Sequence, residues 1–568
     1  MNQDSVSIAK SNQAWGQIVA ETLHELGIST VFFSPGSRST PLVLGFERHS
    51  EIECFPVLDE RSAAFIALGY SKRKQVPSVL LCTSGSAPTH WLPALTEANQ
   101  NSIPLLVLSA DRPPELRDCG AGQTINQIKV FGSFVRSFHE VPLPSIKPES
   151  INDLRTTLVL AYTNSLGLNP GPVHLNFPFH EPFIPEQWHP PLTLPKLKFP
   201  VAVQSEKTDL TGLIQKEIDL SKRPLIIAGE KVSSKLLLDW LKEYQIPVIC
   251  DSLSPLRDCQ YSNRILRYEN LLRDEIFSKV VVPDLIFVLG PLPTSKTLRK
   301  WIELCKAKRI VIEPRGINVD PLSSPSLCFQ MDYELLCNLR FPAPEKEWCK
   351  AWKDAERNME NKFDHAFKKE LPRFEGKLIY LLSLHMPSNA ILQVGNSMPI
   401  RDLEWFWQPG KHNRKLFGNR GVNGIDGTIS TALGIAHKSV TPTYLVTGEL
   451  AFLHDSNALL FNEQFQGSLT VFLINNQGGG IFENLPIAGE PEFEKCFVTP
   501  QSCDFLHICK AHGIDFIRAS NWSEVIDYIK NPIDSGIRVI EIETDRKADR
   551  ETRQSLLSLS PQPLSRES

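Results

Sequence analysis

The chain has no long apolar run and no excess of charge of one sign. It carries 60 Lys and Arg against 64 Asp and Glu, and the net charge of −4 gives no footprint for nucleic-acid binding. No stretch approaches the roughly 20 apolar residues that span a bilayer. The opening segment MNQDSVSIAKSNQ also lacks the basic and apolar regions of a secretory signal. We therefore expect a protein of the cell interior, cytoplasmic or in a plastid, with no nucleic-acid partner and no membrane span.

Ordered cysteine motifs are missing as well. The 12 cysteines are scattered, without a CxxC pair or a regular framework. Such spacing favours reduced thiols over disulfides or a zinc site.

The 568 residues exceed what one hydrophobic core holds, so we expect about three domains. Alternating strand and helix patterns predict an α/β fold of three doubly wound parallel-sheet domains. The expected order is an N-terminal domain (1–182), a proline-dense linker (183–200), a central domain (201–340), an exposed connecting helix (341–378), a C-terminal domain (379–550) and a tail (551–568), with fraying from residue 546. The two outer domains look alike, which suggests duplicated architecture.

Apolar runs bounded by turn residues mark the expected strands. They fall at 30–33, 55–58, 79–82, 104–108 and 173–176 in the first block, at 224–228, 246–250, 284–289 and 309–312 in the second, and at 390–394, 444–447, 469–474, 514–517 and 538–542 in the third.

The stretch 443–485 carries the strongest functional signal. Glu449 and Asn476 each follow a buried strand, and Gly478 begins a run of three glycines. Because parallel strands end at one edge of a sheet, these side chains are expected to meet in a crevice. Oxygen ligands suit a hard cation such as Mg²⁺, and glycines allow close approach of the backbone to a ligand. The stretch therefore predicts a metal–diphosphate site.

Polar residues also follow the N-terminal strands. Ser37 and Arg38 suit an anion, although a capped turn with a solvated arginine explains them equally well. Glu60 stands where a strand meets a helix. It either complements the helix dipole, the reading that position alone favours, or is a buried acid that shares a proton with a ligand nitrogen. A long polar loop carries Arg112 and Gln123.

Several segments together resemble a known family. An acid followed by an Asn-Asn pair, and a strand–Glu–helix near the N-terminus, resemble the thiamine-diphosphate enzymes. SPGSRSTPL, LDERSAAFIALGYSK, TSGSAPTHWLPALTEA, SADRPPELRDCGAGQTINQ, GNSMPIRDL, GNRGVNGIDGTISTALG and NNQGGGIFENLP, in this order over nearly the whole chain, resemble one family among them. That family is the 2-succinyl-5-enolpyruvyl-6-hydroxy-3-cyclohexene-1-carboxylate (SEPHCHC) synthases, the carboligases of menaquinone and phylloquinone synthesis.

The resemblance implies a role for each matching residue. Glu60 would be catalytic and bond the aminopyrimidine of thiamine diphosphate. The implied cofactor contacts are Glu60, Ser84, Gln123, Ile425, Leu450, Ala451, Asn476 and Ile481, and the implied ligands of Mg²⁺ or Mn²⁺ are Glu449, Asn476 and the carbonyl of Gly478. The implied substrate contacts are Ser37, Arg38, Arg112, Gln123, Lys296, Asn396, Ser397, Arg401, Arg420, Ile481, Phe482 and Leu485. Without the resemblance, Lys296 reads as a surface lysine.

The implied activity is decarboxylation of 2-oxoglutarate and addition of the resulting succinyl-semialdehyde carbanion to isochorismate. The several cations suit these carboxylate-rich substrates, because arginine binds a carboxylate through two hydrogen bonds. In the enzymes that the chain resembles, the N-terminal domain of one chain meets the C-terminal domain of another across the cofactor. A homodimer is therefore implied, or a homotetramer.

The sequence departs from the family pattern at the metal acid, which is usually Asp and here is Glu449. The longer side chain is expected to weaken metal binding or to favour Mn²⁺. Ala451 replaces a frequent Ser, whereas Asp455 and Asp426 read as structural charges. Two alternatives stay open: another thiamine-diphosphate-dependent 2-oxo acid decarboxylase or carboligase, and a non-catalytic subunit with this fold.

Overall fold

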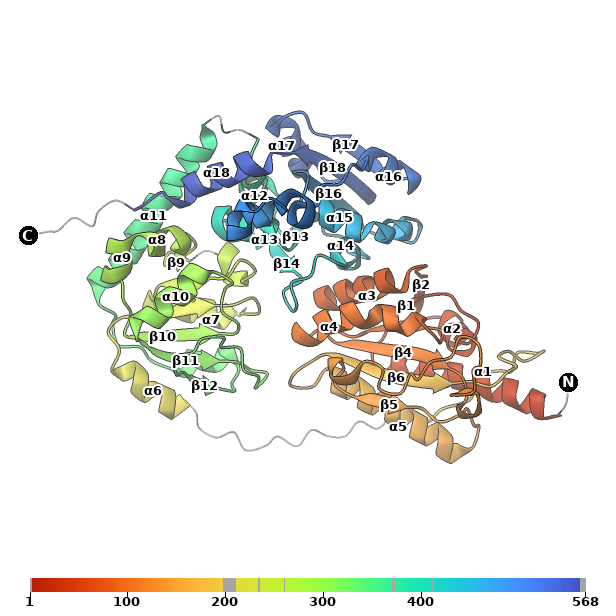
Figure 1. Cartoon of the computed structure of the whole chain (residues 1–568). Coiled ribbons are helices and arrows are strands. Elements are labelled where there is room, and N and C mark those ends of the chain that lie inside the picture. Colours follow the sequence, from red (N-terminus) through yellow and green to blue (C-terminus); the bar gives the residue numbers. More distant parts are fainter. Residues whose placement is uncertain are drawn as a thin grey trace, which may run out of the picture.

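The structure, a computed structural model, describes residues 3–197, 211–232, 235–259, 261–369, 371, 373–410 and 413–561. It contains three six-stranded sheets, and every strand pairing within them is parallel. Helices cover the sheets, so the expected α/β class is confirmed (Figure 1).

The N-terminal sheet has the order β2-β1-β3-β4-β6-β5. Its strands are β1 (Thr30–Phe33), β2 (Glu53–Pro56), β3 (Ser78–Cys82), β4 (Leu105–Asp111), β5 (Phe138–Glu140) and β6 (Pro172–Pro178). Its helices are α1 (Gln3–Glu25), α2 (Thr40–Glu47), α3 (Glu60–Lys74), α4 (Leu92–Gln100) and α5 (Pro148–Ser165).

The central sheet has the order β12-β11-β10-β7-β8-β9. Its strands are β7 (Pro224–Ala228), β8 (Val248–Cys250), β9 (Arg264–Ile265), β10 (Leu285–Leu289), β11 (Lys308–Ile312) and β12 (Leu327–Phe329). Its helices are α6 (Thr211–Asp219), α7 (Lys235–Tyr244), α8 (Tyr268–Arg273), α9 (Glu275–Val280) and α10 (Lys296–Cys305).

The C-terminal sheet has the order β14-β13-β15-β16-β18-β17. Its strands are β13 (Ile391–Val394), β14 (Lys415–Gly418), β15 (Thr443–Gly448), β16 (Ser468–Asn475), β17 (Asp515–Arg518) and β18 (Gly536–Glu543). The helices that follow the central domain are α11 (Lys346–Lys368), α12 (Glu375–His385), α13 (Met398–Phe406), α14 (Thr428–Ala436), α15 (Glu449–His454), α16 (Phe505–Ala511), α17 (Trp522–Lys530) and α18 (Arg546–Leu557).

The two outer sheets share one strand order, and the central sheet has another. In chain order the outer sheets read 2-1-3-4-6-5, whereas the central sheet reads 6-5-4-1-2-3. An open parallel sheet binds ligands where its strand order reverses, at the carboxyl ends of the strands. By this rule crevices are expected at the ends of β1 and β3, of β7 and β10, and of β13 and β15.

The N-terminal and C-terminal domains meet along α3 and α14, which lie side by side in Figure 1. Two glycines allow the contact. A Cβ atom on Gly69 would lie 2.1 Å from the carbonyl oxygen of Thr431, and one on Gly434 would lie 2.0 Å from that of Ile66. The close backbone approach holds the two domains together within one chain.

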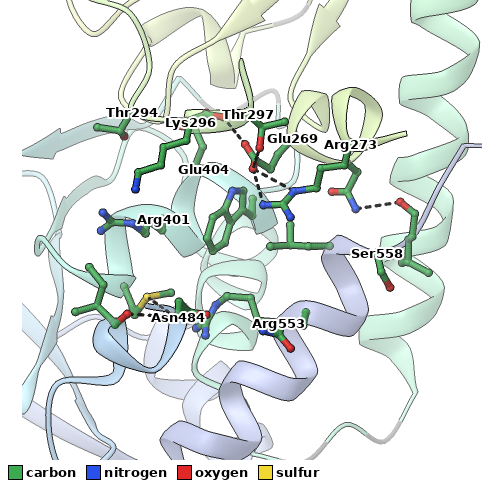
Figure 2. Close-up of a pocket in the computed structure, with 18 of the residues that line it drawn as sticks. Glu269, Arg273, Thr294, Lys296, Thr297, Arg401, Glu404, Asn484, Arg553 and Ser558 are labelled. Carbon is green, nitrogen blue, oxygen red and sulfur yellow. Dashed lines mark hydrogen bonds and ion pairs between the residues drawn. The ribbon is translucent and has the colours of Figure 1, made fainter. Parts of the chain in front are cut away.

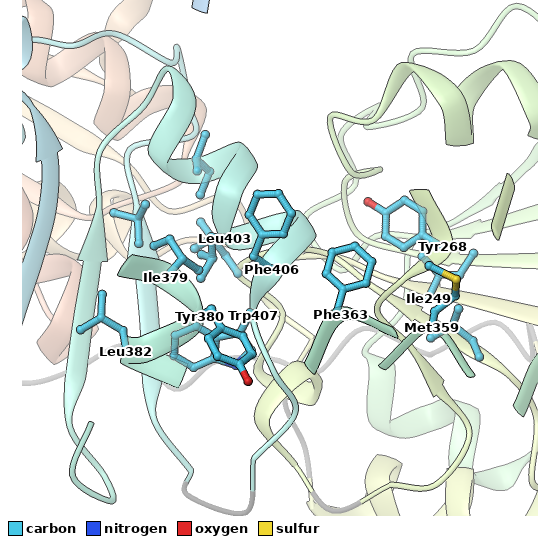
Figure 3. Close-up of a cluster of buried hydrophobic side chains, with 14 of the residues drawn as sticks. Ile249, Tyr268, Met359, Phe363, Ile379, Tyr380, Leu382, Leu403, Phe406 and Trp407 are labelled. Atoms are coloured by element: carbon cyan, nitrogen blue, oxygen red, sulfur yellow. The ribbon is translucent and has the colours of Figure 1, made fainter. Parts of the chain in front are cut away.

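The central and C-terminal domains share a second core (Figure 3). It joins Tyr268 of α8, Phe363 of α11, and Phe406 and Trp407 at the end of α13, all of them buried. This shared core holds α10 and α13 on either side of the cavity described below.

The structure corrects two expectations about exposed segments. Helix α11 is not an exposed connector, because Trp352, Met359 and Phe363 bury one of its faces completely. The chain does not fray from residue 546, because 546–557 form α18, in which Arg553 is buried. Each helix carries many charged residues outside one apolar stripe, and these charges made the whole segment read as exposed in the sequence.

Four strands were not expected: β5, β9, β12 and β14. Each is an edge strand of four residues or fewer.

Residues 183–197 form no helix or strand, and 198–210 lie outside the described residues. All 12 cysteines are free thiols, as expected. Among the described residues no helix has the length and apolar character to cross a membrane.

Candidate active site

The carboxyl ends of two neighbouring C-terminal strands bring the expected metal residues together. Glu449 directly follows β15, and Asn476 and Gly478 follow the neighbouring β16. The backbone N–H of Gly478 donates to Glu449 Oε1 at 2.5 Å, so the two strand ends are in direct contact. Leu450 and Ala451 follow Glu449 in the first turn of α15.

Glu449 is a buried carboxyl with only 3% of its surface exposed. Burial disfavours its charged form and raises its pKa to about 7, against the opposing effect of the backbone N–H groups around it. A cation beside this carboxyl would reverse the shift, because an opposite charge favours the ionised form.

Asn476 offers a buried side-chain oxygen to a ligand. Its Oδ1 atom accepts no hydrogen bond from any residue that the structure describes, while its Nδ2 atom donates to Glu375 at 3.1 Å. A buried polar atom without a partner costs free energy unless a ligand satisfies it. The carbonyl of Gly478 already accepts from the N–H of Gly480 at 2.9 Å and keeps its second lone pair. Carboxylate, amide and carbonyl oxygens together fit a hard divalent cation.

The loop 419–427 carries Arg420 and Ile425 and is anchored on Asn396. Arg420 donates to Asn396 Oδ1 at 2.6 Å, and Asn396 Nδ2 donates to the carbonyl of Gly424 at 2.6 Å. The side chain of Ile425 remains 36% exposed. The loop therefore presents an apolar side chain and holds a guanidinium beside the end of β13.

A cavity of about 950 Å³ lies between α10 and α13. It is lined by four of the expected ligand residues, Lys296, Arg401, Ile481 and Leu485. Figure 2 shows Lys296 entering from the central domain and Arg401 from the C-terminal domain. Phe482 is not among the lining residues, and its ring packs against Phe497 instead.

Four cations line the cavity: Arg273 and Arg553, which are paired with Glu269 and Glu375, and the two expected substrate contacts Arg401 and Lys296. The last two differ in their own contacts. Arg401 donates to the carbonyl of Ser397 at 2.6 Å, and burial together with Arg420 lowers its pKa. Ser397 has φ +73°, a backbone conformation that non-glycine residues rarely adopt and that often marks a functional site. The ammonium of Lys296 makes no hydrogen bond or ion pair within the described residues. Its neighbours Ser295 and Thr297 both donate to the carboxylate of Glu269.

A second group of expected residues lies at the ends of β1, β3 and β4. Arg112 donates to Ser84 Oγ, Ser84 Oγ donates to the carbonyl of Gln123 at 3.1 Å, and Gln123 Nε2 donates back to the carbonyl of Ser84 at 3.2 Å. Beneath them the fully buried Gln127 accepts from the N–H of Gly85 and donates to the carbonyl of Ala110. The polar loop after β4 is thus tied to the turn after β3.

Arg38 and Ser37 follow β1. Arg38 is buried, donates to the carbonyl of Phe179 at 2.8 Å and pairs with Glu181 at 3.2 Å. Burial, then Arg112, lowers its pKa. Ser37 is exposed, and its carbonyl accepts from Thr40.

Glu60 is the first residue of α3 and is half-buried. Within the described residues its carboxylate has no hydrogen bond or ion-pair partner. The residues on either side of it contact the far end of α15, where Arg61 donates to the carbonyl of His454 and Asn457 donates to Asp59, each at 2.9 Å. Glu449 stands at the opposite end of that helix.

The structure therefore gathers the expected residues into two groups rather than one. One group lies at the C-terminal strand ends and the cavity beside them, and the other lies on the N-terminal sheet. No N-terminal residue is among those that line the cavity. Asp455, read from the sequence as structural, accepts from the N–H of Ser430 at 2.7 Å at the start of α14.

Sequence reasoning missed Glu375 and Arg553. Both are buried beside Asn476, but they lie in segments with no motif: a helix start in a charged stretch and a polar tail. The sequence signal for a buried helix around Arg553 was a helical spacing of apolar residues. The many charged residues of α18 outweighed that signal.

The chain was compared with known proteins. Residues 14–130 match the N-terminal, and residues 404–542 the C-terminal, thiamine-pyrophosphate-binding domain of thiamine pyrophosphate enzymes. The 2-succinyl-5-enolpyruvyl-6-hydroxy-3-cyclohexene-1-carboxylate synthase of Trichodesmium erythraeum is 40% identical over 96% of this chain and 97% of its own length. The protein of that name from Gloeothece citriformis is 40% identical over 98% of this chain and 99% of its own length. A crystal structure of benzoylformate decarboxylase from Polynucleobacter necessarius has the same fold, with a TM-score of 0.71 at 17% identity over 94% of this chain and 99% of its own.

Proposed function

Because the chain belongs to the 2-succinyl-5-enolpyruvyl-6-hydroxy-3-cyclohexene-1-carboxylate synthase family of thiamine-diphosphate-dependent enzymes, we propose that it decarboxylates 2-oxoglutarate and joins the remaining four-carbon unit to isochorismate. The product carries the name of the family and belongs to menaquinone or phylloquinone biosynthesis. The observation that supports this choice of substrates is the pair of cations, Lys296 and Arg401, in one cavity. Both proposed substrates carry two carboxylates, which such cations bind.

The metal site is proposed at Glu449, Asn476 and the carbonyl of Gly478, with Mg²⁺ or Mn²⁺ as the ion. The Oδ1 atom of Asn476 supports this assignment, because it is a buried oxygen that accepts no hydrogen bond from the described residues. Leu450 and Ala451, in the first turn of α15, would contact the diphosphate, and the exposed side chain of Ile425 would supply an apolar contact to the cofactor.

When bound, thiamine diphosphate supplies the electron sink for cleavage and formation of the carbon–carbon bonds. Glu60 would hold a proton at its carboxyl oxygen against the cofactor's aminopyrimidine, since it has no partner in the described part of the chain. Ser84 and Gln123 would contact the cofactor, and Arg38 and Arg112 would hold substrate carboxylates beside them. Ile481 and Leu485 would exclude water from the cavity.

A homodimer is proposed as the smallest active form. The residues that line the cavity come from the central and C-terminal domains, and Arg61, next to Glu60, contacts the end of α15 opposite Glu449. A second copy would bring the N-terminal group of one chain to the C-terminal strand ends of the other. The exposed apolar side chains Leu58, Val422, Ile425 and Leu460 support such a contact.

The activity is tested with purified protein, thiamine diphosphate, Mg²⁺ or Mn²⁺, 2-oxoglutarate and isochorismate, by following CO₂ release and isochorismate loss together. We expect both to proceed at equal rates. CO₂ release that ignores isochorismate would point to a different 2-oxo acid decarboxylase. Absence of turnover with either metal in folded protein would refute the proposal.

The role of the cavity is tested by Arg401→Met. A hydrogen bond to a charged group contributes about 1.5–3 kcal/mol. The kcat/KM for whichever of the two substrates binds Arg401 should therefore fall roughly 10- to 100-fold. Lys300→Met is the matched control, because Lys300 is an exposed cation on α10, outside the cavity lining. Equal effects of the two substitutions would show a general loss of charge rather than a substrate contact.

A further inference from the structure

Behind the proposed metal site lies a buried carboxylate that no motif marks. Glu375 is the first residue of α12 and is 3% exposed. One of its oxygens accepts from Asn476 Nδ2 at 3.1 Å, and the other forms an ion pair with Arg553 of α18. Glu375 thus stands between the amide of Asn476 and a buried guanidinium.

The chemistry of this contact determines which way the Asn476 amide faces. An ionised carboxylate only accepts hydrogen bonds, whereas an amide has one accepting and one donating end. The carboxylate of Glu375 must therefore face the NH₂ group of Asn476. The Oδ1 atom is left on the other side, where it is buried and has no partner in the described part of the chain.

Arg553 holds Glu375 in the position that this orientation requires. Its guanidinium also binds both oxygens of Asp402 on α13, at 2.9 and 3.0 Å. The backbone N–H of Glu375 donates in turn to Asp549 at 3.1 Å. A guanidinium only donates hydrogen bonds, so the Glu375 oxygen that faces Arg553 is an acceptor. Arg553 thereby joins α12, α13 and α18 around Glu375.

We propose that Glu375, paired with Arg553, is a positioning residue that turns the Asn476 amide so that Oδ1 faces the divalent cation. The inference rests on the proposed function in one respect, that a cation binds at Asn476. Glu375 does not touch the cation itself. It acts by excluding the flipped amide, which would present two N–H donors to a positive ion.

The test is Glu375→Gln, in which the local geometry predicts an inverted amide. Arg553 donates only, so it would take the oxygen of the new carboxamide and leave the NH₂ group facing Asn476. Oδ1 of Asn476 would then turn toward that NH₂ group and away from the cation. Substitution of a residue that orients a metal ligand typically weakens metal affinity 10- to 100-fold. We expect a loss of that size in Mn²⁺ titrations followed by electron paramagnetic resonance, with thiamine diphosphate present.

Glu356→Gln is the matched control. Glu356 is also a buried glutamate, 5% exposed, and it accepts from the N–H groups of Leu266 and Arg267 in the central domain. We expect its replacement to leave Mn²⁺ affinity unchanged. Equal losses in both variants would show a structural role only and would overturn the inference, as would wild-type Mn²⁺ affinity in folded Glu375→Gln protein.

A donor–acceptor exchange provides a second, independent measurement. In the wild-type background, Asn476→Asp places the new carboxylate at position 476 against the carboxylate of Glu375. In the Glu375→Gln background, the same carboxylate accepts a hydrogen bond from the carboxamide at position 375. We expect Asn476→Asp to strengthen Mn²⁺ binding at least tenfold only in the Glu375→Gln background. The same effect in both backgrounds would overturn the inference. Failure of the wild-type protein to bind Mn²⁺ would instead refute the proposed metal site.

Discussion

Glu60 is the residue whose assigned role is most directly testable. A positioned proton donor or acceptor typically contributes 10²- to 10⁴-fold to a rate. We expect Glu60→Gln to bind thiamine diphosphate with near-normal affinity and to lose activity by about that factor, because the amide cannot exchange a proton with the cofactor. Calorimetric titration of the cofactor and the CO₂ assay measure the two effects separately. Near-normal turnover would contradict the role.

Glu449 stands where the family pattern has the shorter Asp. Its Oε1 atom lies 2.5 Å from the N–H of Gly478, a contact that Glu449→Asp would withdraw by about one carbon–carbon bond, ~1.5 Å. Mg²⁺ demands nearly ideal octahedral geometry, whereas larger ions tolerate longer ligands. We expect Glu449→Asp to raise the affinity for Mg²⁺ relative to Mn²⁺, measured as the ratio of the two dissociation constants. An unchanged ratio would show that the side-chain length does not select the ion.

At the scale of helices and strands, the contact between the N-terminal and C-terminal domains is made by α3 and α14. This contact depends on glycine. A methyl group on Gly434 would lie 2.0 Å from the carbonyl oxygen of Ile66, so the two helices would have to separate. Overpacking of this kind costs typically about 1–3 kcal/mol. We expect Gly434→Ala to lower the melting temperature in calorimetry. Gly489→Ala is the control, because among the described residues no heavy atom other than those of Gly489 and its chain neighbours lies within 4 Å of its Cβ position. An equal effect there would refute the packing argument.

His437, at the end of α14, makes this domain contact sensitive to acid. It is fully buried, its ring lies 4.4 Å from that of Phe55, and its Nδ1 atom accepts from the N–H of Gln466. Burial, helped by Arg73, lowers its pKa from 6.5 to about 4. On lowering the pH, His437 therefore becomes protonated near pH 6.5 in the unfolded chain but only near pH 4 in the folded chain. This contribution to stability is complete above pH 6.5 and is lost as the pH falls through that window.

We expect the loss to be on the order of 3 kcal/mol in the free energy of unfolding between pH 6.5 and 4. His437→Phe keeps a ring among its aromatic neighbours and removes the titrating group. Its melting temperature should therefore fall less steeply with acid than that of the wild-type protein. Parallel curves for the two proteins would show that His437 does not titrate in this range.

The individual helices and strands show why the sequence predicted part of the fold and part of the site. Interior strands such as β15 and β16 are continuous apolar runs, because both faces of a parallel sheet are covered. The four missed strands are short edge strands, and β5 and β12 contain no buried residue. The strand-end residues Glu449 and Asn476 were found because turns follow apolar runs there. Glu375 was not, because only the folded chain brings it to Asn476 across 101 positions.

At the scale of the whole molecule, the proposed homodimer makes a prediction about mixed dimers. If each site takes Glu60 from one protomer and Asn476 from its partner, a dimer of one Glu60→Gln chain and one Asn476→Ala chain has one doubly defective site and one intact site. Two inactive proteins, mixed in equal amounts and allowed to exchange subunits, should then recover roughly a quarter of wild-type activity in a twofold-symmetric dimer.

The control mixture combines Glu60→Gln with Arg112→Met, whose defects both lie on the N-terminal sheet. Every site in that mixed dimer keeps one defect, because Glu60 and Arg112 come from the same protomer. No activity should return. Recovery in the first mixture but not in the second would mean that the two groups of residues form a site only between chains. Failure of both, with subunit exchange verified by mass, would mean that a single chain completes its own site by moving its N-terminal domain.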